Sequence, residues 1–538
     1  MADQNPQTET VTCTVDGIEI TVPKGTRIID AAARVGAEIP HYCYHPGLSS
    51  PAQCRLCLVE VEKAPKLVPS CSATVADGNV IHTQSEKALQ AREGVLEFYL
   101  VNHPLDCPVC DQAGECKLQD YVSAEGPAMG RTREPKRVLG RDDFGGDVLF
   151  YADRCVMCTR CVRFMREVAQ DERLTVVQRG SRNVIDTFFD EGLDGNVWAD
   201  NVVDLCPVGA LVSKDFLHKA RAWDLDRHPS ICPNCTQGCN VRLETRDNQV
   251  MRMKPRHNED VNSHWMCDYG RLNYSWINRG NRIEAPLVRE GDRLSPVTWS
   301  GALTRLVDLV RGAQGGARAV VSPFMSNEDV GALRRVLDVA GFGGGVFRVE
   351  QGEEIVLPGF PTLALRNDRA ANVHGAELLG FTRAGAADAT GGLEEAAAHT
   401  GVLFVLGDEL KDAPADFGRN AALFVYVGHF LTSQAARNAH VVLPATTFAE
   451  MEGSFTNVQR RVQRFWPAVL APGMARPAWQ ILGVLHAGLT GGEVPATPAD
   501  AFAALGTVRP EFAGLDWAEL GSQGRPLPEP RALAEAGD

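Results

Sequence analysis

The chain has 538 residues, a hydrophobic content of 44% and a formal net charge of -14 at pH 7. This length predicts three or four domains with ordinary globular cores, and the acidic balance argues against nucleic-acid binding, which depends on clustered Lys and Arg. No stretch is long and apolar enough to span a bilayer, so we expect membrane association only through partners. Residues 1–12 lack the basic region and apolar run of a secretory signal, which predicts a reducing compartment with free thiols.

The distribution of cysteines is the most informative feature of the chain. Fifteen of the sixteen cysteines fall into four clusters before residue 270, one histidine completes the last vacant position, and only Cys13 is left over. The first group is Cys43, Cys54, Cys57 and Cys71, the second is His103, Cys107, Cys110 and Cys116, the third is Cys155, Cys158, Cys161 and Cys206, and the fourth is Cys232, Cys235, Cys239 and Cys267. These sets predict four metal sites of four ligands each, in a chain that carries electrons.

The spacing of the third group separates iron–sulfur clusters from the alternatives. A reducing compartment disfavours disulfides. A Cys-x2-Cys-x2-Cys run with a remote Cys206-Pro207 is typical of bacterial ferredoxins, whereas zinc ribbons pair two distant Cys-x2-Cys motifs. Soft, deprotonated thiolates are also the ligands that such clusters require. Iron–sulfur is therefore favoured for the third group, and zinc stays a weaker alternative for the other groups taken singly.

The first group follows a hairpin and a helix. Residues 11–15 and 18–22 alternate as two strands around an Asp16-Gly17 turn, which makes Cys13 a core residue. Thr26 is expected to cap a helix that ends at Gly36. Hairpin, helix and then the first group match the pattern of a plant-type [2Fe-2S] domain, although the cysteine spacing departs from the plant-type run.

A second helix is expected to start after Ser85, to bury Leu89, Leu96, Tyr99 and Leu100, and to lead into the second group. Cys107 and Cys110 also have the spacing of a thioredoxin-like redox pair. That alternative is disfavoured because no strand leads into it and His103 and Cys116 lie at ligand spacing. A neutral imidazole in place of one thiolate removes negative charge, and imidazole ligation raises the potential in Rieske centres.

Several arginines accompany the ligands. They could offset cluster charge or offer hydrogen bonds that tune it, and solvated surface arginines are an equally good interpretation for each one alone. These arginines are Arg55, Arg154, Arg160, Arg163 and Arg166.

The C-terminal half alternates short strands and helices. Residues 319–322, 402–406 and 423–427 are predicted as buried strands and 328–340 as a helix, which favours a doubly wound α/β domain. Gly341 to Gly345 is interpreted as a turn, because Val346 takes the place of the third glycine of a nucleotide loop. With no other convincing NADH or flavin site, the chain should receive electrons from a partner. The Ala-, Gly- and Pro-rich tail from about Pro495 is expected to be partly disordered.

The order of the four groups resembles the large iron–sulfur subunit of bacterial NADH-quinone oxidoreductase, respiratory complex I. The resemblance covers residues 9–285 with specific motifs and continues more weakly to about residue 470. It implies a [2Fe-2S] cluster on the first group and [4Fe-4S] clusters on the other three, with the fourth an offshoot found in some bacterial members. It also implies a peripheral-arm subunit on the cytoplasmic side of the inner (plasma) membrane. The implied partners are the flavin-binding NADH subunit, the small [2Fe-2S] subunit, and downstream iron–sulfur and quinone-site subunits.

The fourth group and the C-terminal half also resemble molybdopterin oxidoreductases, in particular at residues 442–448 and 452–457. Those enzymes usually hold their metal through a Cys or selenocysteine beyond the cluster domain. No Cys follows Cys267, so we expect no molybdenum and a redox-silent domain, with a Ser or Asp ligand left open. The runner-up function is therefore the iron–sulfur or catalytic subunit of an NAD-linked formate dehydrogenase or hydrogenase, and a third hypothesis is a protein whose metals only staple domains.

The expected fold class is a set of α+β iron–sulfur modules, a β-grasp [2Fe-2S] ferredoxin and then [4Fe-4S] ferredoxin-like modules, followed by a doubly wound α/β molybdopterin-oxidoreductase-like domain. The expected boundaries are 9–87 and 88–127 for the first and second groups, 140–224 and 225–281 for the third and fourth, 282–480 for the α/β domain, and 481–538 for the tail.

Overall fold

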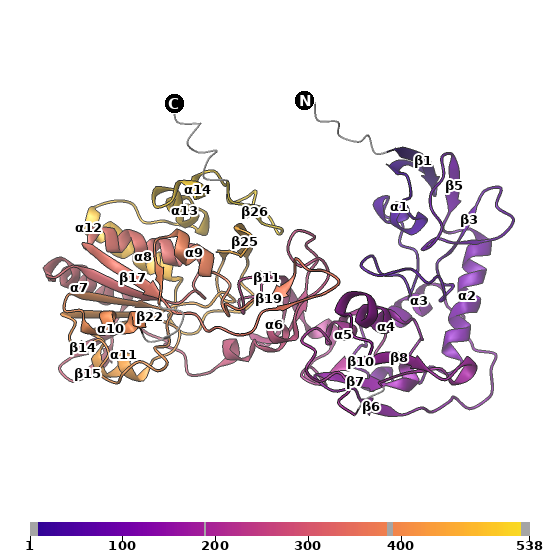
Figure 1. Cartoon of the computed structure of the whole chain (residues 1–538), viewed down its shortest axis with the longest axis horizontal. Helices are drawn as coiled ribbons and strands as arrows, with labels where there is room; N and C mark the ends of the chain where they lie inside the picture. Colours follow the sequence, from indigo (N-terminus) through magenta and orange to yellow (C-terminus); the bar gives the residue numbers. More distant parts are fainter. Residues whose placement is uncertain (1–8, 188–189, 385–390, 529–538) are drawn as a thin grey trace. The chain divides into compact units, whose positions relative to one another are not determined.

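The computed structural model describes residues 9–187, 190–384 and 391–528 (Figure 1). The chain divides into two compact units. Unit 1 contains residues 1–225 and 357–360, and unit 2 contains residues 226–356 and 361–538. Among the described helices, none combines the length and the apolar character needed to cross a membrane.

Unit 1 begins with a five-stranded sheet in the order β2-β1-β5-β3-β4. Its strands are β1 (Thr10–Val15), β2 (Ile18–Pro23), β3 (Leu58–Val61), β4 (Val68–Pro69) and β5 (Asn79–His82). The predicted hairpin is confirmed, because Val15 pairs with Ile18 across Asp16 and Gly17, which both have positive φ. The core position of Cys13 is also confirmed, since its exposed fraction is 2%.

Helix α1 (Ile28–Arg34) packs its apolar face into the same core. The prediction of its cap was wrong: Arg27 is the N-cap, and the Thr26 hydroxyl donates to the Pro23 carbonyl instead. Thr26 thus stabilises the turn after β2, and the helix begins one residue later than a Thr26 cap would place it. Gly36 adopts the positive φ expected just beyond the end of the helix.

Helix α2 (Glu86–Leu100) begins where predicted, with the Ser85 hydroxyl accepting from the Ala88 N–H. Of the four residues expected to be buried, Leu96 is buried, whereas Leu89, Tyr99 and Leu100 are partly exposed. Arg92 takes a core position instead, because it donates to Glu125 of α3 (Lys117–Glu125) and to the Thr83 carbonyl. A buried arginine on this face is stable because its charge is paired.

The rest of unit 1 surrounds the third group. It contains a three-stranded sheet, β10-β7-β6, and a separate hairpin of β8 and β9. Two short helices, α4 and α5, flank the cysteines. The bounds are β6 (Arg141–Asp143), β7 (Val148–Tyr151), α4 (Arg160–Phe164), β8 (Leu174–Val177), β9 (Val184–Thr187), α5 (Asn201–Leu205) and β10 (Leu211–Ser213).

Unit 2 opens with an antiparallel sheet that carries the fourth group at its end. Its elements are β11 (Asp226–Ile231), β12 (Asn240–Arg246), β13 (Gln249–Pro255) and α6 (Asp268–Leu272). A second small sheet, β24 (Gly453–Thr456), β25 (Arg461–Phe465) and β26 (Arg525–Pro526), lies later in the chain.

The main body of unit 2 is an eight-stranded sheet in the order β15-β14-β23-β22-β21-β16-β17-β20. Its inner strands β23, β22, β21, β16 and β17 run parallel, as predicted for a doubly wound domain. The bounds are β14 (Leu287–Glu290), β15 (Arg293–Pro296), β16 (Ala317–Val321), β17 (Phe342–Phe347), β20 (Thr382–Arg383), β21 (Val402–Leu406), β22 (Leu423–Gly428) and β23 (Val441–Pro444).

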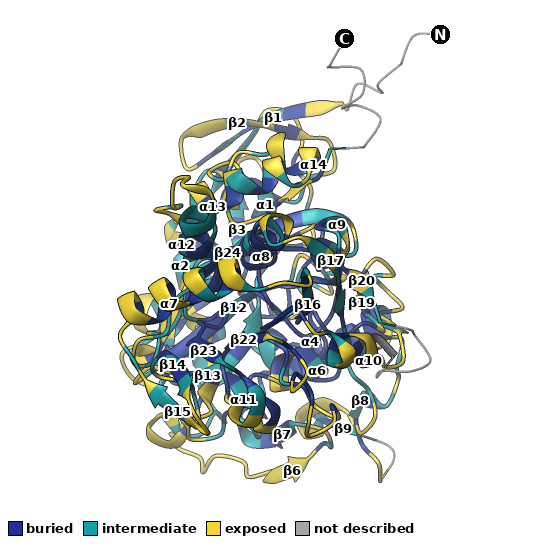
Figure 2. Ribbon diagram, turned by 90° about the vertical axis from the view of Figure 1, so that its left-hand side faces the viewer, coloured by how far each residue is buried: buried dark blue, intermediate teal, exposed yellow. Residues whose placement is uncertain are grey.

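Helices cover both faces of this sheet. Core residues of α7 (Trp299–Gly312), α8 (Asn327–Val339) and α12 (Ala478–Thr490) pack on one face, and those of α10 (Gly391–Ala398) and α11 (Ser433–Asn438) pack on the other. The inner strands β21, β22 and β23 are buried along their whole length, and Figure 2 shows the outer surface of α7 as exposed. The predicted strands and the predicted helix from residue 328 are confirmed.

The turn expected at residues 341–345 was wrong for most of its length. Gly341 lies in a turn, but residues 342–345 belong to β17; a side chain at Gly345 would collide with the Phe381 ring, whose carbons would lie 2.7 Å from its Cβ. The tail is structured as far as residue 528: α13 (Pro498–Ala503) and α14 (Pro510–Ala513) bury Phe502 and Phe512 in the core of the α/β domain. Residues 529–538 lie outside the described residues.

Candidate metal centres

Three cysteines of the first group lie on the loop between α1 and β3, Cys71 follows β4, and all four are buried. Thiol contacts join Cys54 to Cys43, and Cys71 to both Cys43 and Cys57. The hydrogen bond with Cys43, together with burial, raises the pKa of Cys54 well above its ordinary value. Ala52 and Arg55 have positive φ, which turns the backbone on both sides of Cys54. The structure therefore brings all four predicted ligands together.

The second group lies between α2 and α3. Cys110 and Cys116 are buried and Cys107 is exposed, and electrostatic interactions connect both buried thiols with Cys107. Burial raises the pKa of Cys116 to about 11. Burial, with Lys136 and Arg154 nearby, lowers the pKa of His103 to about 4, so its ring is neutral at pH 7, the form that binds metals. The described interactions of His103 are with charged neighbours rather than with the three thiols, so its role as a ligand remains a prediction.

The four cysteines of the third group line one cavity, whose empty volume is about 330 Å³ including space open to solvent. Apolar side chains, among them Phe150, Ile185 and Leu211, complete the wall. Met157 and Thr159, which separate the ligands, have positive φ and fold the chain around the cavity. Burial and the neighbouring thiols raise the pKa of Cys161 far above its ordinary value.

The fourth group lies between the end of β11 and the start of β12 and at the start of α6. The Cys232 N–H donates to the Cys239 carbonyl at 2.9 Å, and the Cys267 sulfur caps α6 by accepting from the Gly270 N–H at 3.3 Å. A Cβ at Gly270 would lie 3.0 Å from the Cys232 sulfur and 3.5 Å from the Cys267 sulfur, so a glycine fits here best. Burial raises the pKa of Cys239, and its three partners add to the effect.

The donor sets fit iron–sulfur clusters. Burial of four thiolates in an apolar pocket is unfavourable without compensating cations, and the raised pKa values express that cost. Bound iron would supply positive charge and would keep the thiols of the four groups deprotonated. Among the described residues, no three His, Cys, Asp or Glu side chains are arranged to hold a single metal ion.

Arginines connect the ligand loops of unit 1. Arg154 stacks on Tyr151 and donates to Asp106 of the second-group segment, and Arg160 donates to the carbonyls of Tyr44 and Leu205. Arg163 is buried between the first and third groups. Arg55 and Arg166, by contrast, are exposed. The interpretation as solvated surface arginines therefore applies to Arg55 and Arg166, whereas Arg154, Arg160 and Arg163 contact the ligand loops.

Sequence reasoning missed a cluster of three tyrosines, of which Tyr42 and Tyr121 are buried and Tyr99 is partly exposed. The Tyr42 ring lies 5.1 Å from Tyr99 and 5.7 Å from Tyr121 between ring centroids, and the Tyr99 hydroxyl donates to the Cys54 carbonyl at 3.3 Å. Burial raises the pKa of each tyrosine; Tyr42 also interacts with Cys116 and Cys54, and Tyr99 with Cys54 and Cys158. Members of the first three groups thus gather around one tyrosine cluster. It lacks a local sequence signal, because its members come from three separate segments.

Sequence reasoning also missed Arg221. Its guanidinium donates to the Cys110 carbonyl at 2.8 Å and to the Pro108 carbonyl, which fixes the loop of the second group from more than a hundred residues away.

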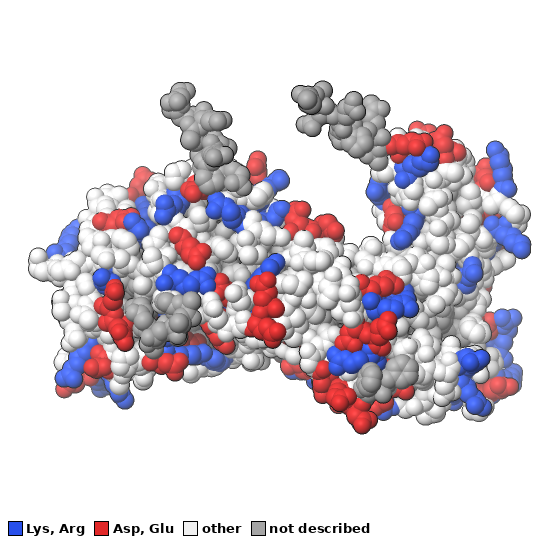
Figure 3. All heavy atoms as spheres, viewed as in Figure 1, with Lys and Arg blue, Asp and Glu red and all other residues white. Residues whose placement is uncertain are grey.

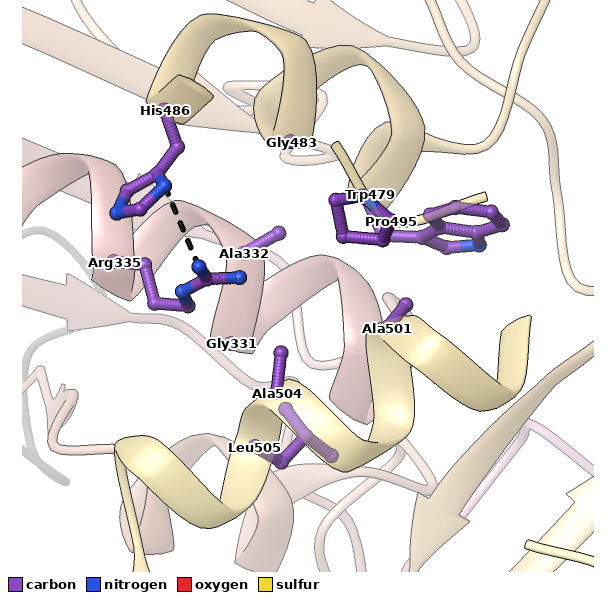
Figure 4. A pocket seen from close by; sticks show the side chains of 10 residues that line it. All are labelled: Gly331, Ala332, Arg335, Trp479, Gly483, His486, Pro495, Ala501, Ala504 and Leu505. Carbon is purple, nitrogen blue, oxygen red and sulfur yellow. Dashed lines mark hydrogen bonds between the residues drawn. The ribbon is translucent and has the colours of Figure 1, made fainter. Parts of the chain in front are cut away.

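The segments at 442–448 and 452–457 lie in and after β23 and in β24. Asn457 donates to the Gln237 carbonyl at 3.3 Å, so the second segment contacts the loop of the fourth group. A separate cavity of unit 2 lies between α8, α12 and α13 (Figure 4). There Arg335 and His486 face each other, with Nη2 and Nδ1 3.4 Å apart, and none of the ten lining residues is a thiol or a carboxylate.

Surface charges of both signs are interspersed on the face shown in Figure 3.

Comparison with protein families gives five matches in chain order. They are a 2Fe-2S iron-sulfur cluster binding domain (residues 8–86), an NADH-ubiquinone oxidoreductase-G iron-sulfur binding region (92–128), the ferredoxin-like domain of NADH-quinone oxidoreductase subunit 3 (145–212), an NADH-ubiquinone oxidoreductase NDSU1/NuoG-like 4Fe-4S domain (234–275) and molybdopterin oxidoreductase (345–487). These matches confirm the expected fold class and the order of its modules.

Similar curated proteins carry the name that the resemblance implied. The NADH-quinone oxidoreductase G subunit of Rickettsia bellii is 42% identical over 55% of this chain and 44% of its own length. The NADH-ubiquinone oxidoreductase 75 kDa subunit of Reclinomonas americana is 43% identical over 61% and 47%. The chain thus spans about half the length of these relatives. A solved structure of an NAD+-reducing [NiFe]-hydrogenase is 28% identical and covers 39% of this chain and 90% of its own, with a TM-score of 0.36.

Proposed function

Since its four cluster modules match those of NADH-quinone oxidoreductases in order, we propose that this chain is an electron-transfer subunit of a proton-pumping NADH-quinone oxidoreductase. It passes electrons from a flavin subunit toward quinone. Its partners are the flavin-binding NADH subunit, the small [2Fe-2S] subunit, and the downstream iron–sulfur and quinone-site subunits. Its place is the peripheral arm, on the cytoplasmic side of the inner (plasma) membrane. The names of the relatives favour this function over a formate dehydrogenase or hydrogenase subunit.

The observation that carries the proposal is the convergence of the first three groups in unit 1. Tyr42 interacts with thiols of the first and second groups, and Tyr99 with thiols of the first and third. Three redox centres that share neighbouring side chains suit transfer from one to the next. The fourth group belongs to unit 2, which supports a role outside this series.

The ligand residues and the side chains around them have different roles in the proposed electron transfer. Iron–sulfur clusters, when bound, accept and donate single electrons. The thiols of the four groups and His103 hold them, with one [2Fe-2S] cluster on the first group and [4Fe-4S] clusters on the others. Buried arginines fix the carbonyls of the ligand loops, and the tyrosines exclude water from the space between the groups.

Metal content and spectroscopy test the proposal. The full chain, reconstituted anaerobically, should contain about 14 iron atoms, the sum of one [2Fe-2S] and three [4Fe-4S] clusters, and should give four reduced signals in electron paramagnetic resonance. Replacement of all four cysteines of the third group by Ser should remove about four iron atoms and one signal, whereas Cys13→Ser is the matched control and should remove none. Zinc in place of iron would contradict the proposal.

A further inference from the structure

One buried arginine contacts ligand residues of two different groups. Arg163, on α4, is 3% exposed. Its Nη2 donates to the Cys43 carbonyl of the first group and, at 3.3 Å, to the Cys158 carbonyl of the third group. Its Nη1 donates to the Ser49 carbonyl, and its Nε donates to the Thr159 hydroxyl at 3.3 Å. All of its nitrogens are therefore fixed by the two ligand loops.

The direct hydrogen-bond partners of the Arg163 guanidinium are neutral: the carbonyls of Cys43, Ser49 and Cys158 and the Thr159 hydroxyl. The Glu167 carboxylate is held by Ser49, whose N–H and hydroxyl donate to it at 3.0 and 2.6 Å. A buried cation is stable only when negative charge lies close to it. When clusters are bound, the thiolates of the first and third groups would supply that charge.

We propose that Arg163 is a positioning residue shared by the first and third groups, and that its fixed positive charge raises the reduction potentials of both clusters. The inference rests on the proposed function only in that the two groups hold iron–sulfur clusters. Reduction adds one electron, and hence one negative charge, to a cluster. A cation fixed nearby in a medium of low dielectric stabilises that reduced state, and hydrogen bonds around the ligands act in the same direction.

Two other residues near these ligand loops, Gln53 and Arg166, do not combine a positive charge with burial. The exposed Gln53 side chain donates to the Met157 carbonyl and the Thr159 hydroxyl, both at 3.0 Å, but it is neutral. Arg166, one turn along from Arg163, is 60% exposed, and its charge is screened by water. These two residues provide matched controls, one for contact without charge and one for charge without burial.

The test is a redox titration of the anaerobically reconstituted full chain, followed by electron paramagnetic resonance. Arg163→Met should lower the reduced-to-oxidised ratio of both clusters at least tenfold at a fixed ambient potential, which equals 59 mV for one electron. Arg163→Lys keeps the charge and should change the ratios less than threefold. Gln53→Ala and Arg166→Met should change them less than twofold. Iron content is measured for every variant, so that potentials are compared at equal cluster loading.

The outcomes are distinct. A shift confined to one cluster, or an equal shift in Gln53→Ala, overturns the shared electrostatic role. If Arg163→Met does not hold iron, Arg163→Gln, which is neutral but retains donors, takes its place. Loss of both clusters from both neutral variants also overturns the inference, because the side chain would then be needed to hold the clusters rather than to set their potentials. Absence of both cluster signals from the unmodified chain would instead contradict the proposed function.

Discussion

Glu328 provides a pH-dependent test of the packing in the α/β domain. This carboxyl group is fully buried in the first turn of α8, where it accepts from the Ser454 N–H at 2.9 Å and from the Ser454 hydroxyl at 2.6 Å. Burial, reinforced by the adjacent Asp329, raises its pKa from 4.5 to about 7. The folded state therefore binds the proton more tightly than the unfolded state does.

The sign and size of the effect follow from this shift. The stability contributed by protonated Glu328 is complete below pH 4.5, is lost as the pH rises through 7, and changes little above that. A shift of this size corresponds to about 3 kcal/mol over the whole window, of which about 2 kcal/mol falls between pH 5.5 and 8. Asp329, whose pKa is raised to about 6, contributes at the lower end of the same window.

Glu328→Gln removes the titration while keeping the shape and an acceptor for the Ser454 N–H. In urea unfolding followed by tryptophan fluorescence, the variant should be more stable than the unmodified chain at pH 8 by about 2 to 3 kcal/mol, with the difference shrinking toward pH 5. Buried histidines such as His429, whose pKa is lowered by burial, favour higher pH, but they are common to both proteins and cancel in the difference. A difference that stays constant from pH 5.5 to 8 would refute the reasoning.

The remaining predictions concern the metal centres. His103→Cys should retain a cluster on the second group with a lower reduction potential, and His103→Ala should destabilise that cluster; redox titrations of both variants that match the unmodified chain would show that His103 is not a ligand. Replacement of the four cysteines of the fourth group by Ser should lower the melting temperature or weaken assembly, whereas NADH-to-quinone turnover per assembled complex should stay near normal. A collapse of that turnover with the other three clusters intact would place the fourth group on the electron-transfer path. Protein expressed with ample molybdate should contain no stoichiometric molybdenum and should not oxidise formate, which elemental analysis and an activity assay check, and recovery of both would favour the runner-up function.

Local patterns predicted the ligand groups, whereas contacts distant in sequence escaped prediction. A Cys-x2-Cys-x2-Cys run places three sulfurs of the third group close together whatever surrounds it, and the remote Cys206 is assigned to the group because Pro207 follows it. The partners of Arg221, and the Ser49 and Cys43 carbonyls that Arg163 contacts, lie more than a hundred residues away, and nothing in the neighbouring sequence distinguishes these arginines from the exposed Arg166. Burial on α2 was misjudged for the same reason, because Arg92 is buried through its pairing with Glu125.

A few large buried side chains order part of a segment whose composition is typical of disorder. The segment from residue 495 is rich in Ala, Gly and Pro, which is typical of disorder. Phe502, Leu505 and Phe512 nevertheless anchor it on the core that contains α8 and α12. Burial of such side chains is worth about 2 kcal/mol each, enough for three of them to order a short segment. Average composition does not register this effect, because it depends on which residues face the core.

The position of the fourth group explains how a cluster off the electron path could still matter. Its loop is tied to the body of unit 2 at several points: the Gln237 side chain accepts from Arg366 at 2.9 Å, and the Gly238 carbonyl accepts from Gln463 of β25 at 2.9 Å. Gln237 and Gln463 are fully buried, so these polar groups need their partners in place. A metal cluster that fixes the loop therefore also fixes the segments that carry the matching donors. Loss of its ligands should first loosen these contacts within unit 2, while the tyrosine cluster of unit 1, formed by Tyr42, Tyr99 and Tyr121, keeps the other three groups together.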